Sequence, residues 1–247
     1  LTKHASVTTP QSTSTPSSQC LIVALAEVVN QCSLTQSDYA RPQGRGKPAF
    51  RPILVAQPRR TLTLHGMPRL FLALALPDAL RADLVGLQAP TAHGVAWAPQ
   101  AQLHLTLRFI GDVPVPSLAA LEDSLATIRV ASFILPLAGV GAFPPRGQPQ
   151  VLWAGVQHAH PHLFQLRQQV DDRLLALGFD ADLKTFHPHA TLARLHRDAS
   201  PGFAAEWLRR HREWEGPPFR ATSFGLYTSQ LTPTGALHTR LREYPLA

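Results

Sequence analysis

The sequence predicts an α+β fold that is bilobal, with two pseudo-symmetric, largely antiparallel sheets flanked by helices and a cleft between them. Strand and helix patterns alternate from Met67 onward. The strand-to-strand spacing is irregular and no glycine-rich nucleotide loop is present, which disfavours a doubly wound parallel sheet. The two-fold arrangement is predicted because one short sequence pattern occurs twice. His-Leu-Thr-Leu-Arg at 104–108 and His-Ala-Thr-Leu-Ala-Arg at 189–194 each place a histidine and a threonine two residues apart in an apolar, β-prone run.

The first elements are predicted from apolar runs and helix-start residues. Residues 69–76 form an apolar run with the length of a buried strand. Pro77 and Asp78 then start a helix that is expected to extend to about residue 88. Residues 103–110 are predicted to form the strand that carries the first repeat, and Gly111 and Asp112 close it.

The later elements continue this alternation. A Pro- and Gly-rich loop at 143–149 separates two strands, and Gly178 ends a helical stripe of apolar residues. The further helices are predicted at 116–128, 161–177 and 201–211. The further strands are predicted at 133–140, 151–156, 189–195, 219–228 and 237–244.

Residues 1–66 differ in composition from the rest of the chain. Their early positions are rich in Ser, Thr, Gln and Pro, and positions 41–60 alternate Arg, Pro, Gly and Gln. Such segments cannot bury enough apolar surface to offset chain entropy. Met67, the only methionine, directly precedes the first ordered pattern. We therefore expect residues 1–66 to be a disordered or wrongly assigned leader and residues 67–247 to be the functional domain. An export signal in the leader is the alternative, and its long Ser- and Thr-rich start disfavours it.

The charge of the chain is concentrated in the leader. The whole sequence has a net charge of +7, but residues 1–66 hold seven Lys and Arg against two acidic residues and contribute +5 of it. Residues 67–247 are therefore only mildly basic, at +2, and the pI alone is weak evidence for a nucleic-acid partner.

Both cysteines, Cys20 and Cys32, lie in the leader, so the expected domain has no disulfide framework and no cysteine-based zinc site. A reducing compartment is the simpler expectation, and we expect a cytoplasmic monomer. No apolar run approaches the roughly 20 residues that cross a bilayer as a helix, so no membrane association is expected.

The repeated histidines and threonines are the candidate chemical groups. Successive side chains on a strand alternate faces, so His104 and Thr106 point the same way, as do His189 and Thr191. The neighbouring leucines then face a core on the other side. Two imidazoles facing one cleft can serve as general acid and general base without a metal. A satisfied core histidine explains one copy alone, but not a titratable group recurring at the same place on two strands.

These segments resemble the paired signatures of a known family. His104-Leu-Thr-Leu-Arg-Phe-Ile-Gly111 and Phe186-His-Pro-His-Ala-Thr-Leu-Ala-Arg194 look like the two HxTx motifs of the RNA 2′,3′-cyclic phosphodiesterases, also called 2′-5′ RNA ligases, of the two-histidine (2H) phosphoesterase superfamily. His187 departs from the usual pattern, and Thr191 identifies His189 as the motif histidine. The resemblance covers about 67–247, because it extends to the segments Arg69-Leu-Phe-Leu-Ala, Phe143-Pro-Pro, Val151-Leu-Trp-Ala-Gly155 and Leu226-Tyr-Thr-Ser-Gln-Leu231.

The resemblance implies an RNA-processing hydrolase that opens a terminal 2′,3′-cyclic phosphate to a 2′-phosphomonoester, with no metal or other cofactor. It implies that His189 accepts a proton from water and that His104 donates one to the departing ribose O3′. The hydroxyls of Thr106 and Thr191 are then expected to donate hydrogen bonds to the non-bridging phosphoryl oxygens.

Arg194 and Phe109 are the expected substrate contacts, each five residues after a motif histidine. Arg194 would place a cation near the phosphate or base, and Phe109 would offer a stacking face for the terminal nucleobase. A surface cation and a core residue are the alternatives for these two positions.

Three other functions use the same site. They are 2′-5′ joining of RNA ends, a cyclic phosphodiesterase that acts on a small nucleotide, and a non-catalytic module that binds RNA ends. The expected partners are therefore RNA ends or nucleotide 2′,3′-cyclic phosphates.

Overall fold

The computed structural model describes residues 66–89, 92–156, 160–232 and 235–247. They all belong to one compact unit that spans residues 58–247. The expectations for residues 1–65, including the leader and its export-signal alternative, lie outside the described residues. No helix in the described part is long and apolar enough to cross a membrane.

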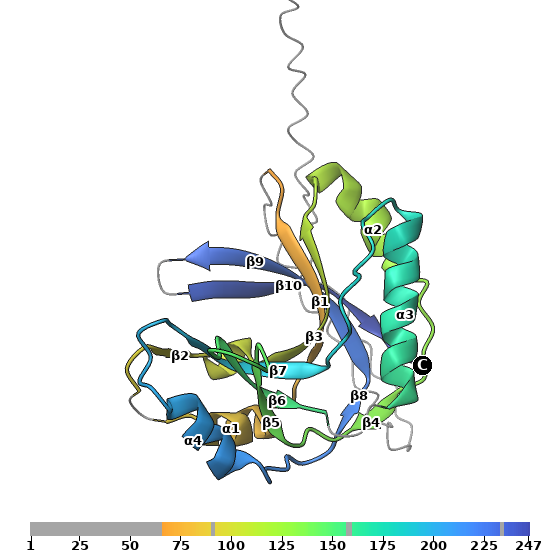
Figure 1. The fold of residues 1–247 in the computed structure, drawn as a ribbon. Coiled ribbons are helices and arrows are strands. Elements are labelled where there is room, and N and C mark those ends of the chain that lie inside the picture. The colour runs from red at the N-terminus through yellow and green to blue at the C-terminus, as the bar shows by residue number, and fades with distance from the viewer. Residues whose placement is uncertain (1–65, 90–91, 157–159, 233–234) are drawn as a thin grey trace, which may run out of the picture. The chain divides into compact units, whose positions relative to one another are not determined.

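The described residues alternate between strands and helices in the order that Figure 1 shows by colour. The strands are β1 (Arg69–Ala75), β2 (Val95–Trp97), β3 (His104–Asp112), β4 (Phe133–Leu135), β5 (Val140–Phe143), β6 (Val151–Gly155), β7 (His189–Leu195), β8 (Phe219–Ala221), β9 (Ser223–Thr232) and β10 (Gly235–Pro245). The α-helices are α1 (Asp78–Gly86), α2 (Leu118–Leu125), α3 (Pro161–Ala176) and α4 (Phe203–His211). Two short 3-10 turns are η1 (Gln100–Gln102) and η2 (Val115–Ser117).

The predicted α+β class with antiparallel sheets is confirmed. Among the described residues, one sheet has the order β10-β9-β1-β3-β7-β6-β5, with β2 paired to β7, and β4 and β8 form a second, two-stranded sheet. Every strand pairing recorded there is antiparallel. The large sheet consists of a first half, β10-β9-β1-β3, and a second half, β7-β6-β5 with β2. The two halves meet at one residue pair, Leu105 with Ala190.

Each half of the large sheet is covered by two helices. On the first half α2 packs against α3, and α3 contacts β3. On the second half α4 contacts β5 and is tied to the end of α1, where Trp207 Nε1 donates a hydrogen bond to the Leu87 carbonyl at 2.8 Å. Figure 1 shows the two helix pairs on different sides of the molecule. The helix-facing core is rich in leucine, including Leu72, Leu105 and Leu107, which are each at most 1% exposed.

Two of the predicted strands are wrong as single elements. The run at 133–140 splits into β4, which pairs with β8, and β5, which pairs with β6. Pro136 lies between them, and a proline has no N–H for a sheet hydrogen bond. The run at 219–228 splits at Thr222, whose carbonyl accepts a hydrogen bond from the Leu246 amide at 2.8 Å. The three-residue strand β2 was not predicted, because so short a segment shows no periodicity.

Candidate active site

The pair that joins the two halves of the sheet brings the predicted site residues together. Leu105 and Ala190 are opposite one another and fully buried, so the residues on either side of them point to the other face of the sheet. Leu105 follows His104 and Ala190 follows His189, and the pairing therefore relates the two motifs by a local two-fold axis. Extending the antiparallel register by one residue in each direction places His104 beside Thr191, and Thr106 beside His189. The two histidines lie on a diagonal of this square.

A β-bulge follows each motif threonine. Along β3, Leu72 pairs with Arg108 and Ala73 pairs with Thr106, so Leu107 is an extra residue. Along β7, the register with β6 likewise passes from Ala193 to Thr191 and leaves Leu192 as the extra residue. The same irregularity therefore occurs three residues after each histidine.

The bulges decide which later residues face the cleft. In a regular strand the fifth residue after a histidine points to the opposite face, and one extra residue reverses this. Phe109 accordingly packs its ring 5.9 Å from that of Phe71, which also contacts His104 at 5.0 Å. Arg108 faces the other way, toward α3, where its side chain is 11% exposed. Arg194, after the second bulge, returns to the face of His189.

The two motif histidines are oriented by the same kind of hydrogen bond to the backbone. His104 Nδ1 lies 2.6 Å from the Gln102 carbonyl oxygen, and His189 Nδ1 lies 2.6 Å from the His187 carbonyl oxygen. A carbonyl only accepts hydrogen bonds, so Nδ1 carries the proton in both rings. Nε2 is then the nitrogen left to exchange a proton in the cleft.

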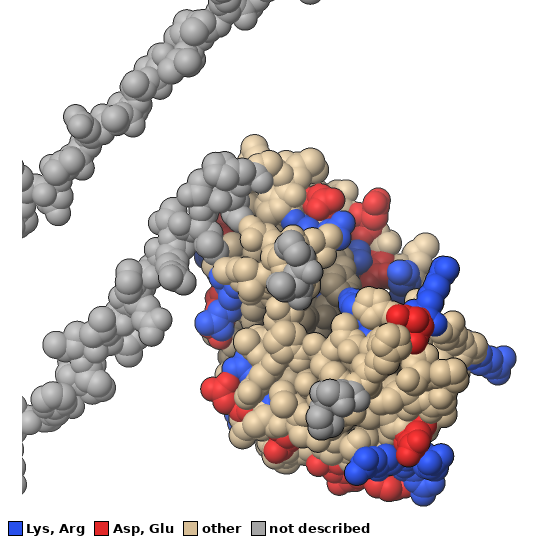
Figure 2. Space-filling model, turned by 90° about the vertical axis from the view of Figure 1, so that its left-hand side faces the viewer, with Lys and Arg blue, Asp and Glu red and all other residues tan. Residues whose placement is uncertain are grey.

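Aromatic rings surround both histidines. His104 lies 5.0 Å from Phe71, and His189 lies 5.1 Å from Phe143 and 6.1 Å from Trp153, measured between ring centroids. Figure 2 shows the face that is hollowed between the two halves of the sheet, with Lys and Arg side chains at its rim.

Glycines allow these rings to lie flat against the sheet. A Cβ added to Gly141 would lie 2.0 Å from the Trp153 ring, and one added to Gly225 would lie 2.6 Å from the Tyr227 ring. A side chain at either position would therefore displace an aromatic ring from the floor of the cleft. Both halves of the sheet contain such glycines, and Gly155 also lies against the Trp153 ring, at 2.7 Å from an added Cβ.

Burial makes both motif histidines harder to protonate. Desolvation lowers the pKa of His104 to about 4; the Gln102 carbonyl opposes this shift, and the nearby imidazoles of His238 and His189 add to it. Burial also lowers the pKa of His189, against the opposing effect of the His187 carbonyl. Both rings are therefore neutral at pH 7 while the cleft is empty.

A third histidine, His238 of β10, was not found from the sequence. Its ring stands perpendicular to that of His104 at 5.2 Å and contacts Phe71 at 4.9 Å. Its Nδ1 is buried and has no hydrogen-bond partner in the described residues. Burial and the charge of Arg194 lower the pKa of His238, which places the Arg194 guanidinium near this side of the cleft. The sequence offered no signal, because His238 is a single histidine without a repeat.

A cluster of charged side chains lies between the sheet and α3 and contacts the backbone near both motifs. Arg108, directly after the first bulge, contacts Asp171 of α3 at 3.1 Å and Asp182 at 3.2 Å. Arg167 of α3 contacts the same two carboxylates, at 2.6 Å and 3.0 Å, and donates to the carbonyl of the bulge residue Leu107.

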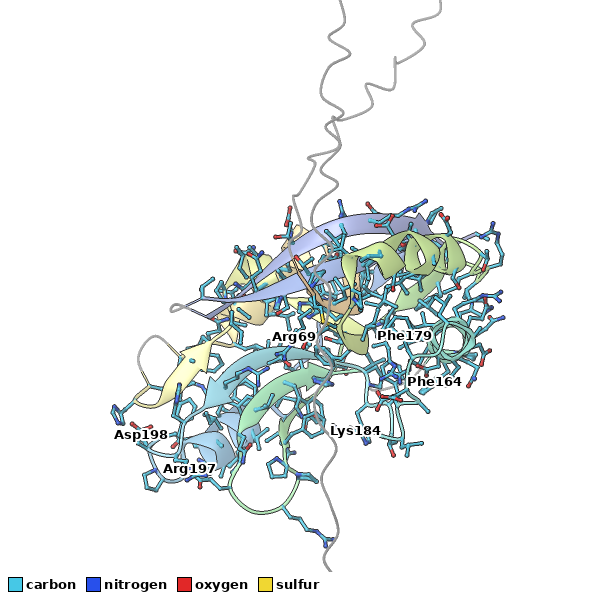
Figure 3. All side chains as sticks on the ribbon, turned by 90° about the horizontal axis from the view of Figure 1, so that it is seen from above. Arg69, Phe164, Phe179, Lys184, Arg197 and Asp198 are labelled. Carbon is cyan, nitrogen blue, oxygen red and sulfur yellow. The ribbon has the colours of Figure 1, made fainter. Side chains whose placement is uncertain are left out.

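The cluster also anchors the segment that leads into the second motif. Arg108 donates a hydrogen bond to the Asp180 carbonyl at 2.6 Å, and the Arg167 guanidinium lies 5.2 Å from the Phe186 ring. Phe186 directly precedes His187, whose carbonyl orients His189. Figure 3 shows Phe179 and Lys184 of this segment on the α3 side of the molecule.

The described ranges offer no ready-made metal centre. Within them, no group of three or more His, Cys, Asp or Glu side chains is arranged to hold a metal ion.

The sequence matches a known protein-family model. Residues 76–232 match the model of the 2′-5′ RNA ligase superfamily. Similar curated proteins are named RNA 2′,3′-cyclic phosphodiesterase. The one from Aeropyrum pernix is 36% identical over 144 residues, which cover 58% of this chain and 82% of that protein. The one from Archaeoglobus fulgidus is 32% identical over 178 residues, covering 71% of this chain and 99% of that protein.

Solved structures show the same likeness. The crystal structure of E. coli LigT complexed with 3′-AMP is 26% identical, with a TM-score of 0.59, and the match covers 74% of this chain and 99% of LigT. The crystal structure of TT0787 of Thermus thermophilus is 31% identical, with a TM-score of 0.58, and the match covers 72% of this chain and 97% of that protein.

Proposed function

This chain belongs to the 2′-5′ RNA ligase superfamily, and we propose that it is an RNA 2′,3′-cyclic phosphodiesterase that works without a metal ion. In the proposed reaction, water opens the cyclic phosphate at an RNA end and leaves a 2′-phosphomonoester. The observation that carries the proposal is the pairing of Leu105 with Ala190, which sets two identically oriented histidines in one cleft.

The two histidines are proposed to divide the proton transfers. His189 accepts a proton from the attacking water, whose oxygen forms the new bond to phosphorus. The bond from phosphorus to O3′ breaks, and His104 donates its proton to O3′. The products are a 2′-phosphomonoester and a free 3′-hydroxyl. One proton has to be shared by the pair, so the two rings are expected to titrate as a unit.

The bound substrate supplies the charge that this mechanism needs. The pKa of His104 is about 4 in the empty cleft, which disfavours its protonated form at pH 7. A cyclic phosphate carries a negative charge, and an anion close to an imidazole raises its pKa. Protonation of His104 is therefore expected to accompany substrate binding, and the mechanism depends on this coupling.

Four further residues are proposed to bind the substrate. The hydroxyls of Thr106 and Thr191, each beside a histidine of the other strand, donate hydrogen bonds to the non-bridging phosphoryl oxygens. Arg194 adds a positive charge close to the phosphate. Phe109 is 65% exposed at the edge of the cleft, which suits a ring that stacks on a nucleobase better than a core residue.

The experiment is product identification on RNA that ends in a 2′,3′-cyclic phosphate. The full chain is incubated with this RNA in excess chelator, with and without a second RNA that carries a 5′-hydroxyl. We expect a 2′-phosphate-ended product at the same rate in both mixtures.

Each other outcome overturns part of the proposal. A 3′-phosphate product contradicts the breaking of the bond to O3′, and loss of turnover in chelator contradicts metal independence. A joined product that forms only with the second RNA supports 2′-5′ ligation instead. Tight binding without turnover identifies a non-catalytic module.

A further inference from the structure

A group of arginines without carboxylate partners lies at one end of the cleft. Arg146, Arg194 and Arg197 form no ion pair within the described residues, although ion pairs are common elsewhere on this domain. The arginines that do pair there are Arg69, Arg81, Arg108, Arg167, Arg209, Arg212, Arg240 and Arg242. The other described arginines that form no ion pair do not line the hollow at this end of the cleft; they are Arg129, Arg173, Arg210 and Arg220. The positive charge at this end is therefore available to an anion from solution.

Two of these arginines, Arg194 and Arg197, line a hollow beside the proposed active site. The hollow has a volume of about 450 Å³, and its polar lining consists of Gln148, Gln150, Arg194, His196 and Arg197. Arg194 faces the cleft of His189 and also lines the hollow, so it marks the boundary between the two. Arg146 lies two residues before Gln148 in the same loop. No carboxylate is among the lining residues.

Hydrogen bonds to backbone carbonyls hold the lining residues in place. The Leu195 amide donates to the Gln150 carbonyl at 2.8 Å, and the His196 amide donates to the Gly94 carbonyl at 2.8 Å. Gln148 Nε2 donates to the Arg197 carbonyl at 3.2 Å, which ties the loop to the end of β7. The hollow is therefore formed before any ligand binds, which limits the entropy cost of binding.

The one carboxylate next to these arginines in sequence is directed at a histidine and forms no ion pair with an arginine. Asp198 directly follows Arg197, but its Oδ2 lies 3.2 Å from Nε2 of His93, with both side chains exposed. Figure 3 shows Arg197 and Asp198 together at an edge of the molecule away from Phe164 and α3.

We propose that this hollow, called here the arginine subsite, binds phosphodiester groups of the RNA strand that precede its cyclic-phosphate end. The inference rests on the proposed function and narrows its substrate to RNA oligonucleotides. A mononucleotide 2′,3′-cyclic phosphate has a single phosphate, which the two motifs already hold. The free charges at Arg146 and Arg197, next to neutral amide donors, match the repeated single charges of an RNA backbone.

The test compares two substrates that share one terminal nucleoside. One is the nucleoside 2′,3′-cyclic phosphate, and the other is a tetraribonucleotide with the same cyclic end. The ratio of their kcat/KM values is measured for the full chain, for R146Q, for R197Q, and for the control R212Q. Arg212 is an exposed arginine that pairs with Glu213.

The full chain is expected to prefer the tetranucleotide. R146Q and R197Q should each lower this preference by about 5- to 10-fold, and R212Q should keep it. With the tetranucleotide, the slope of log kcat/KM against log salt concentration should become less steep by about 0.7 in R197Q, as for the loss of one contact to single-stranded RNA.

Failure of the subsite and failure of the proposed function give different results. Equal kcat/KM values for the two substrates, or an unchanged preference in both R146Q and R197Q, overturn the subsite and leave the hydrolase intact. Absence of turnover on both substrates overturns the hydrolase. Anisotropy of a labelled tetranucleotide then still tests the subsite, because R197Q must weaken its binding and R212Q must not.

Discussion

Leu107 and Leu192 are equivalent residues, because each is the extra residue of a β-bulge three positions after a motif histidine. Both side chains are buried, at 1% and 0% exposure. Each bulge turns the fifth residue after its histidine into the cleft and the fourth residue away from it. The local two-fold symmetry of the site therefore includes an irregularity of the backbone as well as the repeated histidines and threonines.

Removing one motif hydroxyl should slow the reaction without unfolding the protein. Thr106→Val and Thr191→Val keep the side-chain shape and remove one donor to the phosphoryl oxygens. We expect kcat to fall about 100-fold in each variant, since that charge must be stabilised in the transition state. Steady-state kinetics check this against Thr222→Val, which alters an exposed residue between β8 and β9. An unchanged kcat in both cleft variants would exclude the threonines from catalysis.

The pH optimum of kcat/KM should be acidic and lower than that of kcat. The value of kcat/KM reports the empty cleft, where burial lowers the pKa of His104 to about 4 and also lowers the pKa of His189. The form with one shared proton is then most abundant below pH 6.5. A bound phosphate raises both pKa values, so the kcat profile shifts to higher pH. A kcat/KM maximum above pH 7 in initial-rate measurements is incompatible with this account.

Acid should destabilise the fold partly through His104. The folded pKa is about 4 and the unfolded value is about 6.5, so the unfolded chain binds the proton first as the pH falls. The stabilisation from neutral His104 is full above pH 6.5, declines below it, and is gone below about pH 4. Its size is about 3 kcal/mol.

The measurement is the fall in Tm between pH 7 and pH 4.5. It should be smaller in His104→Gln than in the parent. His196→Gln, at an exposed position, serves as the control. An equal fall in the parent and in His104→Gln contradicts the depressed pKa.

Two adjacent carboxylates of α3 should differ strongly in their effect on stability. Asp171 contacts both Arg108 and Arg167, whereas exposed Asp172 accepts a hydrogen bond from Gln168 at 2.9 Å. Asp171→Asn removes a charge that two largely buried guanidinium groups share, and we expect the free energy of unfolding to fall by about 3 kcal/mol. Asp172→Asn should change it by less than about 0.5 kcal/mol. Urea unfolding of the two variants makes the comparison, and equal losses would show that the cluster does not stabilise the fold.

The sequence predicts the motif faces but not the whole site. The alternation of side chains was enough to place His104 with Thr106 and His189 with Thr191, because the apolar residues between them required a buried face. Strict alternation of side chains would have pointed Phe109 and Arg194 away from the cleft. They were predicted as substrate contacts only because the two motifs resemble those of a known family. A bulge has no clear sequence signature, since Leu107 and Leu192 look like ordinary strand residues.

Contacts between segments that are distant in the chain could not be predicted from the sequence either. His238 reaches the site only because β10 and β9 lie beside β1, and the charged cluster forms because α3 packs against β3. Neither contact has a local pattern. The splitting of the run at 133–140 was easier to anticipate, because Pro136 is visible in the sequence.

We propose that His104 and His189 act as one catalytic pair. The direct test measures kcat for His104→Ala, His189→Ala and the double variant on RNA with a 2′,3′-cyclic phosphate end, with Tm as a check of folding. We predict that each single variant loses nearly all turnover and that the double variant is no slower than either, since residues that act as a unit have non-additive effects. Full activity in either single variant, or losses that multiply in the double variant, would contradict a paired-histidine mechanism.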